Sequence, residues 1–365
     1  MDNDIGRWLS EKHVPGLAAC IVSDRHIVWA RGYGAANISK GIPFTPDRTI
    51  FQIASVTKTI TALATMQLRD MGRIALDDDI EDFLGFELRN PQFPDEEITF
   101  ADLLTHSAGI RDNENLYSLY APGDPTVSLK HVVHAYFRRG GEFWTEDNFY
   151  DNPPGETRLY SNMGFALLGH LIEVVSRMPL QDYLKRFVYG PLGMLETSFY
   201  LSQLPKDMHA SPYTFAPVSR ALLIPGDGDG NLLPKGTSPK AGYNEHALYS
   251  FPTLADGMAR TSATQLANFL ICLMNGGRFN GSKILKDGTV DEMLTEDRGG
   301  LGLARVGDYW GHDGSDPGCA AEMFFNPRTK VGFVAVANAD VNLGDIRELL
   351  IDRAEQYHRH AKRSG

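Results

Sequence analysis

The chain carries an apolar hairpin at each end, and this feature constrains its fold more than any other. Near the N-terminus an almost continuous apolar run, Leu17 to Val22, precedes turn residues and a second run, Ile27 to Ala30. Near the C-terminus Ala320 to Phe325 and Val331 to Ala337 flank the turn Asn326-Pro327-Arg328. Such paired runs predict antiparallel strands, and a lone hairpin is marginally stable. We therefore expect both ends to join one antiparallel sheet.

Helices are expected beside both hairpins and throughout the middle of the chain. Asp4 to Lys12 predicts a short helix before the first strand, and the last strand precedes a helix whose apolar residues share one face. The sequence therefore predicts an α+β fold in which helices flank the sheet and an all-helical subdomain is inserted between its parts. The inserted helices are expected at about 55 to 71, 102 to 106, 163 to 177, 180 to 188 and 264 to 276.

This pattern divides the chain into two predicted domains. Residues 1–54 and 290–365 form the sheet domain, and residues 55–289 form a mostly helical domain. Within the second domain, residues 202–252 are rich in glycine and proline and show no clear periodicity. Because a segment of this length is too long for a simple connector, we expect it to shape a pocket or an interface.

Charge and cysteine content exclude several classes of protein. The formal net charge of -11 and a pI near 5.5 disfavour binding to nucleic acid or anionic lipid. The three cysteines are odd in number and far apart, so no disulfide framework or zinc pair is expected. The sequence shows neither a signal h-region nor a membrane span, and we expect a cytoplasmic protein with no membrane partner.

The first candidate for chemistry is the pair Ser55 and Lys58, at the start of the helix predicted from residue 55. Residues three apart on a helix are neighbours, so the serine hydroxyl and the lysine amine are expected within hydrogen-bond reach. Free N–H groups at the helix N-terminus favour a developing oxyanion, and desolvation lowers the pKa of a buried lysine. The position suits a nucleophile and its base, although one Ser-x-x-Lys arises by chance about as often as not in a chain of this composition.

Two further segments strengthen this interpretation. Tyr160-Ser161-Asn162 precedes a predicted helix, and residues two apart in an extended segment point to the same side, so Tyr160 and Asn162 are expected to face one pocket. Trp310-Gly311-His312-Asp313-Gly314-Ser315 is polar and glycine-rich, which lets the backbone approach a ligand closely. Taken alone, the first segment is better explained as a helix start with a packed tyrosine, and the second as a simple turn.

In that order and at those separations, Ser55-x-x-Lys58, Tyr160-x-Asn162 and His312-x-Gly314 resemble the three motifs of the serine β-lactamase and penicillin-recognising superfamily. The similarity is closest to the class C β-lactamase-like branch of esterases, D-amino-acid peptidases and transacylases. It extends to Pro15-Gly16-Leu17-Ala18, to the loop Leu103 to Gly109, and to Pro154-Gly155 before the tyrosine.

The resemblance implies an active site at the junction of the sheet and the helical subdomain. It implies that Ser55 is the nucleophile, that Lys58 and Tyr160 handle its proton, and that Asn162 donates a hydrogen bond to the substrate. The backbone N–H groups of Ser55 and Ser315 would form the oxyanion hole, beside Gly314. Which of Lys58 and Tyr160 is the main base stays open.

One position departs from the family pattern. Members that bind penicillins usually have Lys-Thr-Gly at the third motif, where this chain has His312-Asp313-Gly314. With an ordinary pKa near 6.5, His312 is often neutral at pH 7, so weak or no β-lactamase activity is expected. A neutral His312 also depresses the Tyr160 pKa less than a lysine would, which shifts base duty towards Lys58.

We therefore expect a serine hydrolase acting on small esters or amides, of carboxylesterase or D-amino-acid amidase or peptidase type. Two alternatives stay open: an acyltransferase acting on a small-molecule acceptor, and a catalytically idle binding or assembly protein of the same fold. No cofactor or metal is expected, and a homo-oligomer is left open. His106 is interpreted as structural, and Cys319 as the first residue of a strand rather than a nucleophile.

Overall fold

A seven-stranded antiparallel sheet forms the centre of the computed structural model, which describes residues 1–215, 242–295 and 299–364. The strand order is β12-β13-β14-β15-β1-β2-β3, so the two ends of the chain meet inside one sheet. The strands are β1 (Gly16–Ser23), β2 (His26–Asn37), β3 (Ile42–Pro43), β12 (Ala304–Val306), β13 (Tyr309–Asp316), β14 (Cys319–Asn326) and β15 (Val331–Ala337).

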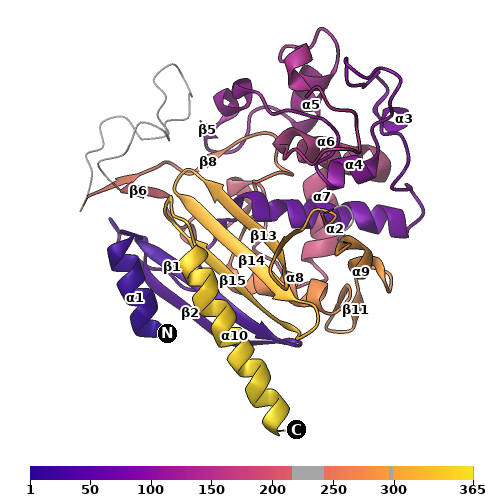
Figure 1. Cartoon of the computed structure of the whole chain (residues 1–365). Coiled ribbons are helices and arrows are strands. Elements are labelled where there is room, and N and C mark those ends of the chain that lie inside the picture. Colours follow the sequence, from indigo (N-terminus) through magenta and orange to yellow (C-terminus); the bar gives the residue numbers. More distant parts are fainter. Residues whose placement is uncertain (216–241, 296–298, 365) are drawn as a thin grey trace.

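The predicted pairing of the terminal hairpins is confirmed. β1 lies between β15 and β2, and its register with β15 runs from Leu17 opposite Ala337 to Ser23 opposite Val331. β1, β14 and β15 are mostly apolar and are buried along nearly their whole length, because both faces of the sheet are covered. Figure 1 shows helices α1 (Asp2–Glu11) and α10 (Gly344–Ser364) lying over one face of the sheet.

Alternate residues of β1 serve two separate cores. Leu17, Ala19 and Ile21 pack under α1 and α10, whereas Ala18 and Cys20 belong to the larger core on the opposite face. That larger core includes α8 (Ala263–Met274), which contacts β1, β14 and β15. α8 lies within the segment 55–289, which was predicted to be mostly helical; the division into two domains itself stays a prediction.

The remaining helices gather beside one end of the sheet (Figure 1). α2 lies at the boundary between these helices and the sheet, because it contacts both α6 and β13. The helices are α2 (Thr57–Asp70), α3 (Glu81–Leu84), α4 (Phe100–Leu104), α5 (Leu129–Phe137), α6 (Asn162–Ser176), α7 (Leu180–Leu184) and α9 (Thr289–Met293). Short helical turns are η1 (Ala54–Val56), η2 (Glu114–Leu119), η3 (Glu146–Asn148), η4 (Lys185–Tyr189) and η5 (Leu201–Gln203).

Several predicted boundaries differ from those observed, and each difference has a local cause. α4 begins before residue 102 because Thr99 and Asp102 form a reciprocal capping box. α2 is preceded by the separate turn η1, which contains Ser55, and the helix predicted to 188 ends in the π-helical turn η4. β2 extends to Asn37 instead of ending near Ala30.

Short strand pairs complete the fold. Only residues 202–215 and 242–252 of the predicted irregular segment lie within the described part of the chain, and they contribute β6, β7 and β8. The short pairs are β4 (Phe51–Gln52) with β9 (Arg260–Thr261), β5 (Ala121–Pro122) with β8 (Tyr249–Ser250), β6 (Tyr213–Phe215) with β7 (Tyr243–Glu245), and β10 (Arg278–Phe279) with β11 (Ser282–Lys283).

Within the described ranges no single helix is long and apolar enough to cross a membrane. The bent pair formed by α6 and residues 180–189 passes that test by length and composition only.

Candidate active site

Ser55 lies in η1, between the short strand β4 and helix α2. The preceding residue, Ala54, has a left-handed backbone with φ of 44°, a conformation that is strained for a residue with a Cβ. This turn packs against β13, where a Cβ added to Gly314 would lie 2.8 Å from the Ser55 backbone nitrogen. The nucleophile candidate is therefore held in a strained turn, pressed against the strand that carries the third motif.

Lys58 lies one turn after Ser55 and is completely buried. Its Nζ lies 3.2 Å from Ser55 Oγ, 2.7 Å from Asn162 Oδ1 and 2.8 Å from the Asp256 carbonyl oxygen. The expected proximity of Ser55 and Lys58 is thus observed. Two of the three neighbours are obligatory acceptors, so they orient the amine and leave its third position directed at the serine hydroxyl.

Tyr160 approaches the same hydroxyl from the other side. Its Oη lies 2.8 Å from Ser55 Oγ, and Lys58 Nζ lies 4.8 Å from the centre of its ring. The side chain is 44% exposed, so the phenol faces solvent while its oxygen contacts the serine. Ser55 Oγ therefore has two proton-handling groups within hydrogen-bond distance, supplied by segments more than 100 residues apart.

His106 supports Tyr160 from behind. The two rings stack at 4.4 Å between centroids, and His106 Nδ1 accepts the backbone N–H of Ser161 at 3.2 Å. Burial, with Lys58 nearby, holds the His106 pKa well below its usual range, so the ring is a neutral acceptor. These contacts support the structural interpretation of this histidine.

Asp112 positions the second motif, and sequence reasoning missed it. Its carboxylate accepts the Ser161 hydroxyl at 2.9 Å and the backbone N–H groups of Asn162 and Met163 at 2.8 and 2.9 Å. These are free donors at the N-terminus of α6, where a negative charge is favourable. As predicted, Tyr160 and Asn162 face the site while Ser161 is buried. The Asn162 amide nitrogen makes no hydrogen bond among the residues described, which leaves a donor for a ligand.

His312 lies on β13, near the tyrosine. Its ring centroid is 6.3 Å from that of Tyr160, and its Nδ1 contacts the Asp313 carbonyl oxygen. Burial, reinforced by the charge of Lys58, lowers the His312 pKa to about 4. The expectation of a neutral imidazole at pH 7 is therefore supported by the surroundings of the ring.

Gly314 and Ser315 follow on a strand, although the sequence alone left this segment indistinguishable from a turn. β12 pairs with β13 only from Tyr309 to Gly311, so beyond that point β13 has an unpaired edge that contacts η1. The Ser55 and Ser315 backbones thus lie on either side of this junction. The structure brings all seven predicted site residues together, while their catalytic roles stay proposals.

Two carboxylates near this junction also went unnoticed in the sequence. Asp256, whose carbonyl oxygen binds Lys58, is buried, and its Oδ1 has no hydrogen-bond partner in the described part of the chain. Asp316 ends β13, where Gln52 Nε2 donates to it at 2.6 Å and Tyr120 Oη at 3.1 Å. Burial raises the Asp316 pKa to about 7, and Asp256 adds to this effect. Single aspartates without a recognisable spacing give no sequence signal.

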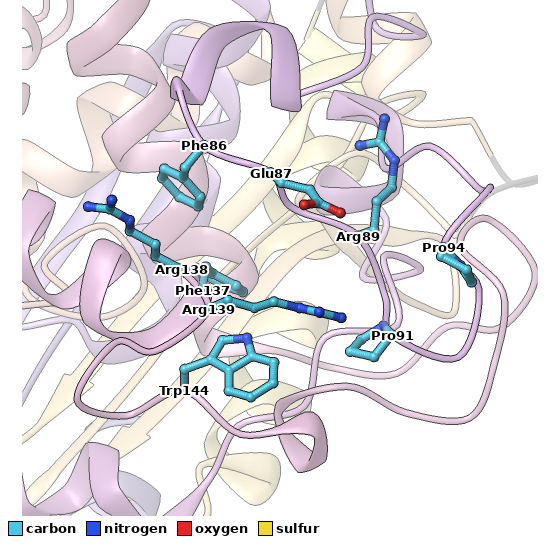
Figure 2. Close-up of a pocket in the computed structure, with 9 residues that line it drawn as sticks. All are labelled: Phe86, Glu87, Arg89, Pro91, Pro94, Phe137, Arg138, Arg139 and Trp144. Atoms are coloured by element: carbon cyan, nitrogen blue, oxygen red, sulfur yellow. The ribbon is translucent and has the colours of Figure 1, made fainter.

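Metal ligands, a cysteine thiol and a second cleft are the other features that could carry chemistry within the described ranges. The residues described contain no cluster of three or more His, Cys, Asp or Glu that could hold a metal ion. Cys319 begins β14 as predicted, and burial raises its thiol pKa well above the usual value. A separate cleft of about 210 Å³ lies among the helices, where Arg139 points between Trp144 and Pro91, and it contains none of the predicted site residues (Figure 2).

Known proteins resemble this chain in sequence and in fold. A family model described as "Beta-lactamase" matches residues 1–357. The curated protein flp of Staphylococcus aureus (strain N315) is 31% identical over 199 residues, which are 54% of this chain and 38% of that protein. The chain thus spans well under half the length of this relative.

Solved structures share the fold. An octameric penicillin-binding protein homologue from Pyrococcus abyssi is 27% identical with a TM-score of 0.68, covering 92% of this chain and 72% of the other. The D-amino acid amidase from Ochrobactrum anthropi SV3 is 20% identical with a TM-score of 0.73, covering 97% of this chain and 96% of the other. At that identity the second likeness concerns the fold alone.

Proposed function

Because this chain belongs to the beta-lactamase family, we propose that it is a serine hydrolase working through an acyl-enzyme on Ser55. The observation that carries the proposal is the convergence of Lys58 Nζ and Tyr160 Oη on one serine hydroxyl, at 3.2 and 2.8 Å. A nucleophile beside two proton-handling groups, one of them buried and oriented, is the arrangement that acyl transfer requires.

Lys58 is the group best arranged to take the serine proton. The carbonyl oxygens of Asn162 and Asp256 accept two of the Lys58 N–H bonds, which leaves the third position of the amine directed at Ser55 Oγ. This orientation favours Lys58 as the base, and a neutral His312 places no fixed positive charge beside Tyr160.

The remaining steps follow from the same contacts. As Ser55 attacks the substrate carbonyl, its backbone N–H and that of Ser315 stabilise the oxyanion at the junction of η1 and β13. Tyr160, which is exposed and hydrogen-bonded to the serine, delivers the proton to the leaving group. A water molecule then attacks the acyl-enzyme and releases the acyl group, with the proton transfers running in the reverse direction. The free Asn162 amide nitrogen donates to the substrate.

The substrates we propose are small esters or amides, of the carboxylesterase or D-amino-acid amidase or peptidase type. A neutral His312 replaces the lysine cation with which penicillin-binding relatives hold a carboxylate, so β-lactamase activity is expected to be weak or absent. Because the structural homologue from Pyrococcus abyssi is described as octameric, oligomerisation of this chain is a further proposal.

Burst kinetics with a nitrophenyl acetate ester test the proposal. The protein should release one equivalent of nitrophenol rapidly and then turn over slowly, and Ser55→Ala should abolish the burst. Alcohol and amine acceptors added to the same reaction would reveal transfer as opposed to hydrolysis. A wild-type protein without a burst or turnover would favour the idle binding protein instead.

A further inference from the structure

We infer that Asp316 makes the site selective for substrates whose acyl half carries a positively charged amine. This inference rests on the proposed function, since it assigns a specificity determinant beside the proposed acylation serine. The observations that carry it are the place of Asp316 on β13, the partners of its carboxylate, and the composition of the surrounding wall.

Asp316 occupies the right position along the strand. It lies two residues after Gly314, on the same face, and residues two apart on a strand are about 7 Å apart. Gly314 lies against the Ser55 backbone, so the Asp316 side chain begins about that far from the acylation point. An α-ammonium lies about 2.5 Å from the carbonyl carbon of an aminoacyl group. The remaining distance between the ammonium and β13 is spanned by the aspartate side chain and one hydrogen bond of about 2.8 Å.

The direction of the substrate is fixed by the proton-handling residues. The leaving group must depart past Tyr160, which lies near His312 at the other end of this stretch of β13. The acyl half therefore extends the opposite way along the strand, towards Asp316. An amine at that end belongs to the acyl group and not to the leaving group.

The Asp316 carboxylate lacks a protein cation. Its partners are neutral donors, Gln52 Nε2 and Tyr120 Oη, and it forms no ion pair within residues 1–215, 242–295 and 299–364. The buried Arg260 is engaged by the Phe199 and Tyr249 carbonyl oxygens and by Ser250 Oγ, and Lys58 is engaged at the serine. Because each carboxylate oxygen has two lone pairs, acceptor capacity remains for an ammonium.

The surroundings favour a cation over an anion. Tyr120 packs against Phe251 at 4.4 Å and Tyr249 at 5.7 Å between ring centroids, which gives an aromatic wall beside the carboxylate. The second buried carboxylate, Asp256, lies close enough to raise the Asp316 pKa and adds to the negative potential there. An ammonium bound here would stabilise the ionised form of Asp316, whose pKa burial raises to about 7.

A pair of substrates tests the inference: an amino acid nitroanilide with a free amine and its N-acetyl counterpart. The wild type should show kcat/KM about tenfold or more higher for the free amine, since a hydrogen bond between charged groups contributes that much. In Asp316→Asn this ratio should fall to near one. Asp313→Asn is the matched control, because Asp313 is an exposed carboxylate on the opposite face of the same strand, and it should keep the wild-type ratio.

A binding experiment separates this inference from the proposed chemistry. In a Ser55→Ala background, calorimetry should detect binding of an amino acid amide, weaker binding of its N-acetyl form, and loss of that difference in Ser55→Ala/Asp316→Asn. The inference would be overturned if the wild type had equal kcat/KM for the two substrates and the Ser55→Ala protein bound the two ligands with equal affinity. It would also be overturned if the preference for the free amine survived in Asp316→Asn. A missing burst combined with retained amine binding would overturn only the proposed hydrolase.

Discussion

Replacing Gly314 with alanine should slow acylation about 100-fold while leaving the fold in place. An added Cβ would lie 2.6 Å from the Ile53 carbonyl oxygen, 2.8 Å from the Ser55 nitrogen and 3.1 Å from the Ala54 Cβ. All three neighbours belong to the segment that presents the nucleophile. None is the end of a flexible side chain, so the backbone itself must move.

The size of the displacement follows from these distances. Ordinary contacts begin at 3.4 Å, so the Ile53 oxygen must retreat by 3.4 − 2.6 = 0.8 Å and the Ser55 nitrogen by 3.4 − 2.8 = 0.6 Å. Overpacking of this kind costs about 1–3 kcal/mol of stability. A misplacement approaching 1 Å costs about 100-fold in rate, and here it moves both the nucleophile and its oxyanion donor.

Stopped-flow kinetics with a nitrophenyl ester measure the change in acylation rate, and thermal unfolding measures the change in stability. Gly6→Ala in α1 is the matched control, because no atom lies within 4 Å of the added Cβ, and it should acylate at the wild-type rate. If Gly314→Ala acylated within about threefold of the wild type, the close approach of β13 to Ser55 would not matter for catalysis.

Four other predictions follow from the site. Tyr160→Phe should lower kcat/KM about 10²- to 10⁴-fold with little change in melting temperature, since the lost hydroxyl handles a proton on a side chain that is 44% exposed; a near-normal rate would remove it from the mechanism. Asp112→Ala should cost about 1–3 kcal/mol in urea unfolding and also slow acylation, because three donors at the start of α6 lose their acceptor; unchanged stability would contradict this role. The folded His312 pKa of about 4 lies below the unfolded value of 6.5, so the unfolded state binds more protons and wild-type stability should fall as pH drops from about 6.5 to 4, less steeply in His312→Gln. His312→Lys places a fixed cation beside Tyr160 and should move the acid limb of the pH-rate profile to lower pH, and an unchanged profile would count against the proposal that the neutral His312 shifts base duty towards Lys58.

Elements with strong local periodicity were predictable from the sequence. The terminal hairpins and the helix containing Ile346, Leu350 and Ala354 have clear apolar patterns, and the structure buries these residues as expected. β13 was not recognisable as a strand, because His312, Asp313 and two glycines give it the composition of a turn. Its strand conformation depends on pairing with β14, which local sequence does not encode.

The candidate site was predictable where spacing carries information. Ser55 and Lys58 are one helical turn apart, so their contact follows from local geometry. Asp112 lies 50 residues before Asn162 in the sequence. Its hydrogen bonds to the start of α6 depend on the tertiary packing of the loop after α4, which local sequence does not reveal. The role proposed for Asp316 likewise depends on its hydrogen bonds with Gln52 and Tyr120, which belong to segments distant from it in the sequence.

The most direct test of the central claim is the intact mass of the protein after exposure to a fluorophosphonate probe. The wild type and the exposed-serine control Ser10→Ala should each gain one adduct, and Ser55→Ala should gain none. An unmodified wild type, or an adduct that persists in Ser55→Ala, would contradict the assignment of Ser55 as the nucleophile.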